Sequence, residues 1–199
     1  MKTKLISIGA SLVLIISMIL IYQWKAQKSY TTEVTKQRKE KEIWMSNSLE
    51  SPFNVKQVVF DGLKYFEPST KYRIEADFKK LLPPDQVTLI TNEGTNREYD
   101  VYGEASFMLD GQLCTLQVLS SEEELGSTLF IPFMDATSGE ESYGAGRYLE
   151  TVIPNSPIIE LDFNQAYNPY CAYMEGYTCP FPPKANVLSV LIRAGEKVY

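Results

Sequence analysis

The feature that most constrains this chain is an uncharged stretch of 18 residues near its N-terminus, Leu5–Tyr22. A helix that is apolar on every side is unfavourable in water, and about 20 such residues cross a hydrocarbon core of about 30 Å. Tyr22 and Trp24 suit the membrane interface, where amphipathic rings gather. We therefore predict one transmembrane helix, with residues 5–24 in the lipid bilayer and residues 1–28 as a membrane anchor.

A cleaved signal peptide is the alternative, but its apolar stretch normally covers about 7–15 residues and precedes a small-x-small site. The stretch here leads into Tyr-Gln-Trp-Lys-Ala-Gln, a poor cleavage site, so we expect a single-pass anchor that is retained. Lys2 and Lys4 favour a cytoplasmic tail, whereas six basic residues at positions 25–41 favour the reverse. We expect the domain to lie outside the cytoplasm.

Charge and composition exclude several classes of function. Residues 46–199 carry 11 basic and 22 acidic side chains, so this part repels phosphate groups and we expect no nucleic-acid partner. Histidine is absent, which excludes a Ser-His-Asp triad, a Cys-His dyad and histidine-based zinc sites. We expect no cofactor and no metal, and any acid–base chemistry would depend on carboxylates, Tyr, Lys or Cys.

Two further regions follow the anchor. Residues 29–50 are rich in helix formers with interleaved acids and bases. They predict a juxtamembrane helical spacer, solvated until its C-terminal end docks through Ile43-Trp44-Met45, or alternatively a helix that binds a partner. Ser51-Pro52 then ends the helix, and residues 51–199 form the globular domain.

Short strands separated by turns dominate that domain. Asp110-Gly111 between two apolar runs is a hairpin signal, because both turn residues need positive φ. The spacing predicts a mainly β, antiparallel sandwich or barrel of seven to eight strands. The expected strands cover residues 72–78, 86–91, 97–103, 105–109, 112–118, 128–133, 158–163 and 187–193.

Residues 135–186 differ in kind, because Gly, Pro, Asn and Tyr are dense there and the first three shape loops. Three prolines around Phe181 predict a rigid, Pro/Tyr-rich C-terminal strap over the sheet. Arg147 either grips an anion or pairs with a buried carboxylate, Asp135 or Asp162, and the Asn residues either bind a ligand or brace turns. The candidate ligand-binding residues are Tyr143, Arg147, Asp162, Asn164, Tyr167, Asn168 and Asn186.

Three cysteines in an exported domain suggest one disulfide and one buried thiol. We expect Cys171 and Cys179 to form the bridge, which leaves Cys114 in a strand. A cytoplasmic domain would instead keep both as free thiols.

Long motifs resemble one protein family. They are Tyr143-Gly-Ala-Gly-Arg-Tyr-Leu149, Leu161-Asp-Phe-Asn-Gln-Ala-Tyr-Asn-Pro169 and Cys179-Pro-Phe-Pro-Pro183, with the upstream Phe60-Asp-Gly-Leu63 and Phe133-Met-Asp-Ala-Thr-Ser-Gly139. From about residue 35 to the C-terminus the chain resembles domain-of-unknown-function family 1684. The resemblance implies a family of uncharacterised activity, so it leaves function open.

The residues favour a binding or structural module over an enzyme. We expect a groove along the loops 143–147 and 162–168 that takes a polar small molecule or a protein partner. The alternative is an enzyme that uses carboxylates and tyrosine on a polar substrate, which requires two carboxyl groups facing each other among Asp135, Glu141 and Asp162.

Overall fold

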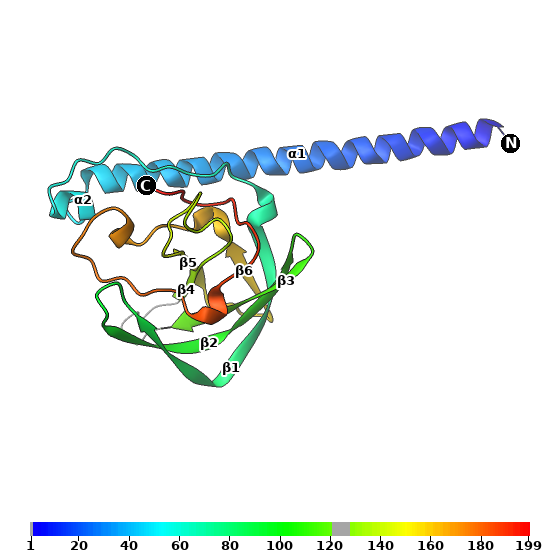
Figure 1. Cartoon of the computed structure of the whole chain (residues 1–199). Helices are drawn as coiled ribbons and strands as arrows, with labels where there is room; N and C mark the ends of the chain where they lie inside the picture. Colours follow the sequence, from blue (N-terminus) through cyan, green and yellow to red (C-terminus); the bar gives the residue numbers. More distant parts are fainter. Residues whose placement is uncertain (1, 121–127) are drawn as a thin grey trace.

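The computed structural model describes residues 2–120 and 128–199, and the side chains from residue 15 onward. Within these residues one long helix lies across the loops that cover a curved antiparallel sheet of six strands (Figure 1). The helices are α1 (Lys2–Asn47) and α2 (Pro52–Val55). The strands are β1 (Arg73–Ile90), β2 (Asn96–Leu109), β3 (Gln112–Ser120), β4 (Thr128–Phe133), β5 (Arg147–Val152) and β6 (Ile158–Asp162).

The sheet curls into a nearly closed barrel. Its strand order is β5-β4-β3-β2-β1-β6, and its two edge strands approach each other where the Thr151 hydroxyl donates to the Glu160 carbonyl at 2.8 Å. Bringing the edges together leaves fewer unpaired backbone groups. The prediction of a mainly β, antiparallel domain is therefore confirmed, in its barrel form.

Individual strands differ from the expected set. β1 and β2 each join two of the predicted strands, and the Leu81–Asp85 segment, expected as a turn, is an irregularity inside β1 between Lys80 and Asp85. Pairing with β2 resumes beyond the two prolines, so the missing backbone donors interrupt the ladder without ending the strand. β5 was not predicted, and residues 187–193 form no strand: Val187 makes a single bridge with Met134.

The Asp110-Gly111 turn is as predicted. Both residues have positive φ, 50° and 77°, and they connect β2 to β3 in register from Leu109 and Gln112 onward. A two-residue turn of this hand matches the twist of the strands that it joins.

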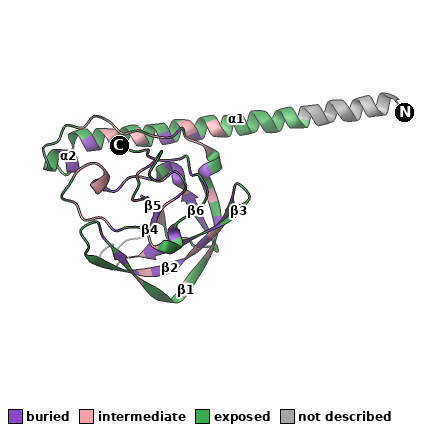
Figure 2. Cartoon of the chain, viewed as in Figure 1, coloured by how far each residue is buried: buried purple, intermediate pink, exposed green. Residues whose placement is uncertain are grey.

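Alternation along the strands places one apolar face inside the barrel (Figure 2). Phe107, Leu116, Phe133 and Phe163 belong to this main core. The C-terminal strap, from residue 163 to the end of the chain, contributes side chains such as Ile192 to the same cluster. The strap is thus part of the core as well as a cover over the barrel.

Helix α1 does not fit the expected spacer. Its docked part begins at Gln27, well before the predicted contact at residues 43–45, because Gln27 Nε2 donates to the Pro68 carbonyl at 2.8 Å. The Tyr30 hydroxyl donates to the Asp162 carboxylate at 2.6 and 2.8 Å. Val34 and Met45 are buried on the same side. These docked side chains form a stripe only about one residue wide per turn. The charged residues around it therefore hid the apolar pattern in the sequence.

Across the part of the chain whose side chains are described, no helix is long and apolar enough to span a membrane. Residues 5–14 of the predicted anchor lie outside those described side chains.

Asn186 joins two strands that diverge. β3 and β4 pair at Leu119 and Phe130, and beyond this point the Asn186 amide lies between them. It accepts from the Gln117 N–H at 2.7 Å and donates to the Gln117 and Pro132 carbonyls at 2.9 and 2.8 Å. The side chain therefore replaces a stretch of backbone pairing, which explains why an amide is buried in the barrel wall.

We expect Asn186→Ala to lower the free energy of unfolding by about 2–4 kcal/mol, because one donor and two acceptors, of which the Pro132 carbonyl is buried, lose their partner. Chemical denaturation of the full chain measures the effect. Asn155→Ala, on an exposed loop, is the matched control and should leave the midpoint unchanged. Equal stability of the two variants would contradict the assigned role.

Candidate functional site

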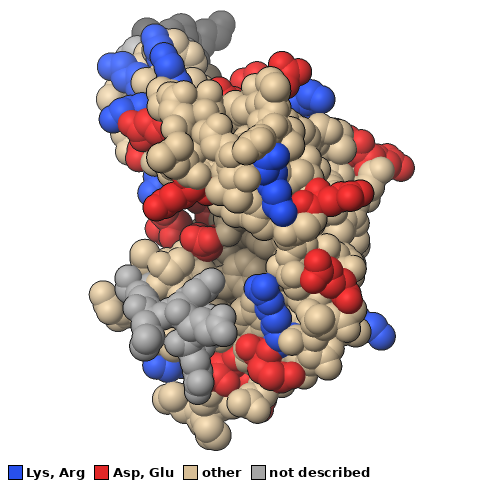
Figure 3. All heavy atoms as spheres, turned by 90° about the vertical axis from the view of Figure 1, so that its left-hand side faces the viewer, with Lys and Arg blue, Asp and Glu red and all other residues tan. Residues whose placement is uncertain are grey.

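A pocket of about 260 Å³ opens where the strap passes over strands β2, β4 and β5. The face that carries the strap and the β1–β2 turn is hollowed, with basic and acidic side chains around the hollow (Figure 3). The pocket is lined by Arg97, Tyr99, Phe130, Tyr148, Glu150, Tyr167, Pro169, Tyr170, Thr178, Cys179 and Pro180.

Aromatic rings form one continuous wall of this pocket. Tyr99 and Phe130 have ring centroids 5.7 Å apart, Phe130 and Tyr148 stack edge to face at 4.8 Å, and Tyr148 and Tyr167 do so at 5.9 Å. Edge-to-face pairs fix ring positions. Because the rings come from three strands and the strap, the wall exists only in the folded domain.

The hydroxyl group of Tyr148 fastens the wall to the strap. It donates a hydrogen bond to the Pro180 carbonyl at 2.7 Å. Burial raises the pKa of the Tyr148 phenol well above its ordinary value. The group therefore stays protonated, and its ring stays neutral, throughout the physiological range.

Two side chains of opposite charge line the same pocket. Arg97 on β2 donates to the Thr178 carbonyl at 3.1 Å. Glu150 on β5 accepts a hydrogen bond from the Tyr167 hydroxyl through Oε1. A second cation lies close by, because the Lys41 ammonium sits 4.7 Å from the centre of the Tyr167 ring. Among the described residues, the lining itself therefore offers one cation, Arg97, and one carboxylate, Glu150, beside aromatic rings.

A disulfide holds the part of the strap that forms the outer wall of the pocket, opposite the aromatic rings. Cys171 and Cys179, the expected pair, are bonded, while Cys114 is buried as a free thiol. Asn92 in the β1–β2 turn accepts from the Cys179 N–H at 2.7 Å and donates its own N–H to the Cys179 carbonyl at 3.1 Å. The strap is thereby fixed to the turn at the edge of the pocket.

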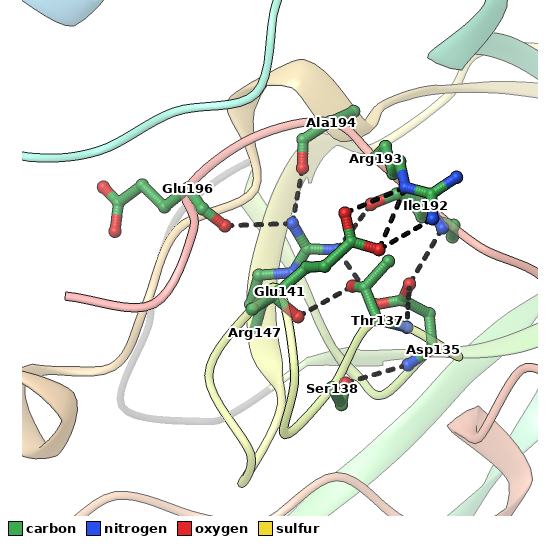
Figure 4. A network of polar contacts seen from close by, with 10 residues as sticks. Asp135, Thr137, Ser138, Glu141, Arg147, Ile192, Arg193, Ala194 and Glu196 are labelled. Carbon is green, nitrogen blue, oxygen red and sulfur yellow. Dashed lines mark hydrogen bonds and ion pairs between the residues drawn. The ribbon is translucent and has the colours of Figure 1, made fainter.

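Arg147 lies outside the pocket and is fully buried. Its guanidinium donates to Asp135 Oδ1 at 2.9 Å, to the Ile192 carbonyl at 2.9 Å, and to the carbonyls of Ala194 and Glu196 (Figure 4). Burial lowers the pKa of Arg147, although the nearby Asp135 carboxylate opposes this shift. The sequence left two roles open for Arg147, binding an anion or pairing with a buried carboxylate. In the structure it pairs with Asp135.

The predicted asparagines brace the fold in a similar way. Asn164 accepts from the Ser69 N–H and donates to the Ser69 carbonyl, each at 2.9 Å. Asn168 donates to the Lys197 carbonyl at 2.8 Å. Asp162 accepts from Tyr30, so these groups are used within the chain.

Gly146 makes the tight turn in front of Arg147. Its φ is +93°, and an added Cβ would lie 2.7 Å from the Phe133 carbonyl oxygen, so only glycine fits. The Gly146 N–H donates to the Tyr143 carbonyl at 3.1 Å. Tyr143 is half-buried and does not line the pocket.

Of the seven predicted ligand-binding residues, Tyr167 alone lines this pocket. Sequence reasoning missed Arg97, Tyr99, Tyr148 and Glu150. Arg97 and Tyr99 lie two positions apart on β2, as do Tyr148 and Glu150 on β5. Residues with this spacing project to the same face of a sheet. This spacing was the available signal, but β5 had not been recognised as a strand.

Among the described residues, no cluster of three or more cysteine or carboxylate side chains could hold a metal ion.

The family can be decided by comparison. The profile of the family described as "Protein of unknown function (DUF1684)" matches residues 58–197, most of the chain. The chain belongs to this family. None of the curated proteins compared with the chain matches it.

A solved structure supports the same assignment. It is the solution NMR structure of an uncharacterised protein of Haloarcula marismortui, with 36% sequence identity and a TM-score of 0.65. The alignment covers 85% of this chain and 95% of that protein. Both comparisons connect the fold to proteins without an assigned activity, so function has to be argued from the site.

We expect Arg147→Ala to lower the free energy of unfolding by about 3–5 kcal/mol, because the Asp135 carboxylate would be left buried without its partner. Arg147→Lys keeps the charge but loses the forked geometry of the guanidinium. Its free energy of unfolding should lie between those of the parent chain and Arg147→Ala. Denaturation in urea measures all three proteins.

Arg193→Ala is the control for this series, since Arg193 pairs with Glu141 on the exposed surface. It should unfold with nearly the same midpoint as the parent chain. If Arg147→Ala unfolded at the same urea midpoint as Arg193→Ala, the buried network would not stabilise the fold.

Proposed function

We propose that this domain is a binding module for a small molecule, held in the pocket between the aromatic wall and the strap. The observation that carries the proposal is the pocket lining, which combines five aromatic rings with Arg97 and Glu150. Binding sites typically pair apolar and aromatic walls with a few polar groups that orient the ligand.

The rigidity of the surroundings supports this proposal. The rings are fixed by edge-to-face contacts, and the disulfide together with Asn92 fixes the opposite wall. A preformed site loses little conformational entropy when a ligand enters. The volume, about 260 Å³, suits a compact molecule.

The enzyme alternative lacks the geometry that it requires. Asp135 is buried with Arg147, Glu141 pairs with Arg193 at the surface, and Asp162 accepts from Tyr30. These carboxylates have separate partners and none of them lines the pocket. A two-carboxylate mechanism on these residues is therefore not favoured by the site.

Binding can be tested with fragments on the full chain. Ligand-observed NMR with benzoate, glucose and choline samples an aromatic acid, a neutral sugar and an ammonium ion. We expect at least one to bind, and we expect Thr178→Trp to abolish the signal because the indole fills the pocket. Thr88→Trp, on an exposed part of β1 outside the lining, should preserve it.

Two results would contradict the binding proposal. One is the absence of a signal from every fragment with the parent chain. The other is an equal signal from the parent chain and Thr178→Trp, which would place binding elsewhere on the molecule.

We also propose that the N-terminal part of α1 anchors the domain to a lipid bilayer through residues 5–24. Figure 1 shows α1 extending well beyond the barrel, and the first side chain that docks is Gln27. Ile16, Ile19 and Trp24 are exposed on the undocked part. Exposed apolar residues on several sides of a helix favour lipid over water. The disulfide supports a domain outside the cytoplasm.

Flotation with phosphatidylcholine–phosphatidylglycerol vesicles tests the anchor. The full chain should float with the vesicles, and the double variant Ile16→Asp/Ile19→Asp should not, since each aspartate costs about 2.5–3.5 kcal/mol at a membrane-embedded position. Thr32→Asp/Thr35→Asp adds the same charge to an exposed face of the docked helix and should float. Flotation of all three proteins, or of none, would contradict the anchor.

A further inference from the structure

We propose that the pocket binds a zwitterion that carries a methylated ammonium group at one end and a carboxylate at the other. This inference rests on the proposed binding function and names the class of ligand. The juxtaposition that points to it is a wall of tyrosine and phenylalanine rings with Glu150 beside it and Arg97 in the same lining.

The ring wall suits the ammonium end. Tyr99, Phe130, Tyr148 and Tyr167 form an unbroken series of rings, and the negative face of a neutral ring attracts a cation. Methyl groups on the ammonium remove its hydrogen-bond donors and match the apolar surface of the rings. A bare ammonium would instead need several acceptors, which a wall of rings does not supply.

Glu150 adds a full negative charge to this end. Its Oε1 accepts from the Tyr167 hydroxyl, which holds the carboxylate beside one of these rings. Within the described part of the chain its Oε2 accepts no side-chain hydrogen bond, so this oxygen can face a bound cation.

The nearby lysine does not neutralise the site. Lys41 lies over the Tyr167 ring, but its ammonium group pairs with the buried Glu196 carboxylate at 2.8 Å. These two charges offset each other, and among the described residues the charged side chains that line the pocket are Arg97 and Glu150. A ligand that complements both must itself carry both signs.

Arg97 suits the carboxylate end. Its guanidinium has five donors, and the structure uses one nitrogen, Nη2, for the Thr178 carbonyl. This bond holds the side chain against the strap and leaves donors for a planar carboxylate. A neutral sugar would use the same donors but would gain nothing from the charge of Glu150, so the site favours the zwitterion.

Three probes separate the two ends. Glycine betaine carries both charges, choline lacks the carboxylate, and 3,3-dimethylbutanoate has the shape and carboxylate of betaine without the positive charge. We expect betaine to bind the full chain most tightly in NMR titrations. Each of the other probes should bind roughly tenfold more weakly, as one lost charge-assisted contact predicts.

Two variants should give a crossed pattern. Glu150→Gln should weaken betaine and choline roughly tenfold and spare 3,3-dimethylbutanoate, whereas Arg97→Gln should weaken betaine and 3,3-dimethylbutanoate and spare choline. Glu75→Gln and Arg193→Gln remove exposed charges that do not line the pocket. As matched controls they should leave all three affinities unchanged.

Equal binding of the three probes would overturn the proposal of a zwitterionic ligand. So would losses of affinity that are the same whichever charge, Glu150 or Arg97, is removed. Betaine could fail to bind while benzoate or glucose binds the parent chain and does not bind Thr178→Trp. In that case the binding function stands and only the ligand class is wrong. If no probe binds the parent chain, both proposals fail.

Discussion

The architecture depends on the buried Arg147 guanidinium. The strap contains no regular strand, and in addition to its separate backbone hydrogen bonds Arg147 supplies donors for its carbonyls at Ile192, Ala194 and Glu196. The charge is balanced by Asp135, whose other oxygen accepts from the Ile192 N–H at 2.8 Å. This ion pair thus ties the strap to β5, and its guanidinium lies against the core at the Phe133 ring.

Glu196 extends this arrangement to the helix. Its carbonyl faces Arg147 while its side chain points away from it (Figure 4). The Glu196 carboxylate pairs with Lys41 of α1 and accepts from the Asn168 N–H at 2.9 Å and from the Tyr173 hydroxyl. Barrel, strap and helix therefore meet at one residue. Asn168 directly follows Tyr167, so the same contacts set the position of one wall of the pocket.

Much of the fold could be predicted from the sequence, because strand alternation and the Asp110-Gly111 turn are local signals. The closure of the barrel could not, since it depends on how far the sheet curls. β5 was hidden inside a segment dominated by turn formers, and the docking stripe on α1 was hidden among charges. Residues 187–193 form no strand, because their backbone makes single hydrogen bonds to Met134 and Ala136 and, at Ile192, to the Arg147 and Asp135 side chains, instead of a continuous ladder.

The candidate residues chosen from the sequence and the residues that line the pocket have only Tyr167 in common. Polar side chains in loops signal either a ligand or missing backbone partners, and the sequence does not distinguish the two. For Arg147, Asn164 and Asn186 the partners are carbonyls and N–H groups of distant segments. The pocket lining combines residues from positions 97 to 180, and such a combination is visible only after folding.

We infer that the strap and the barrel enclose a ligand site at the ring wall, separate from the Arg147 network. A crystal structure of the full chain soaked with glycine betaine can test this inference. We expect density for the ligand in the pocket, with its carboxylate at Arg97 and its ammonium group against the rings beside Glu150. Density at the 143–147 loop, or an empty pocket at saturating ligand, would contradict it.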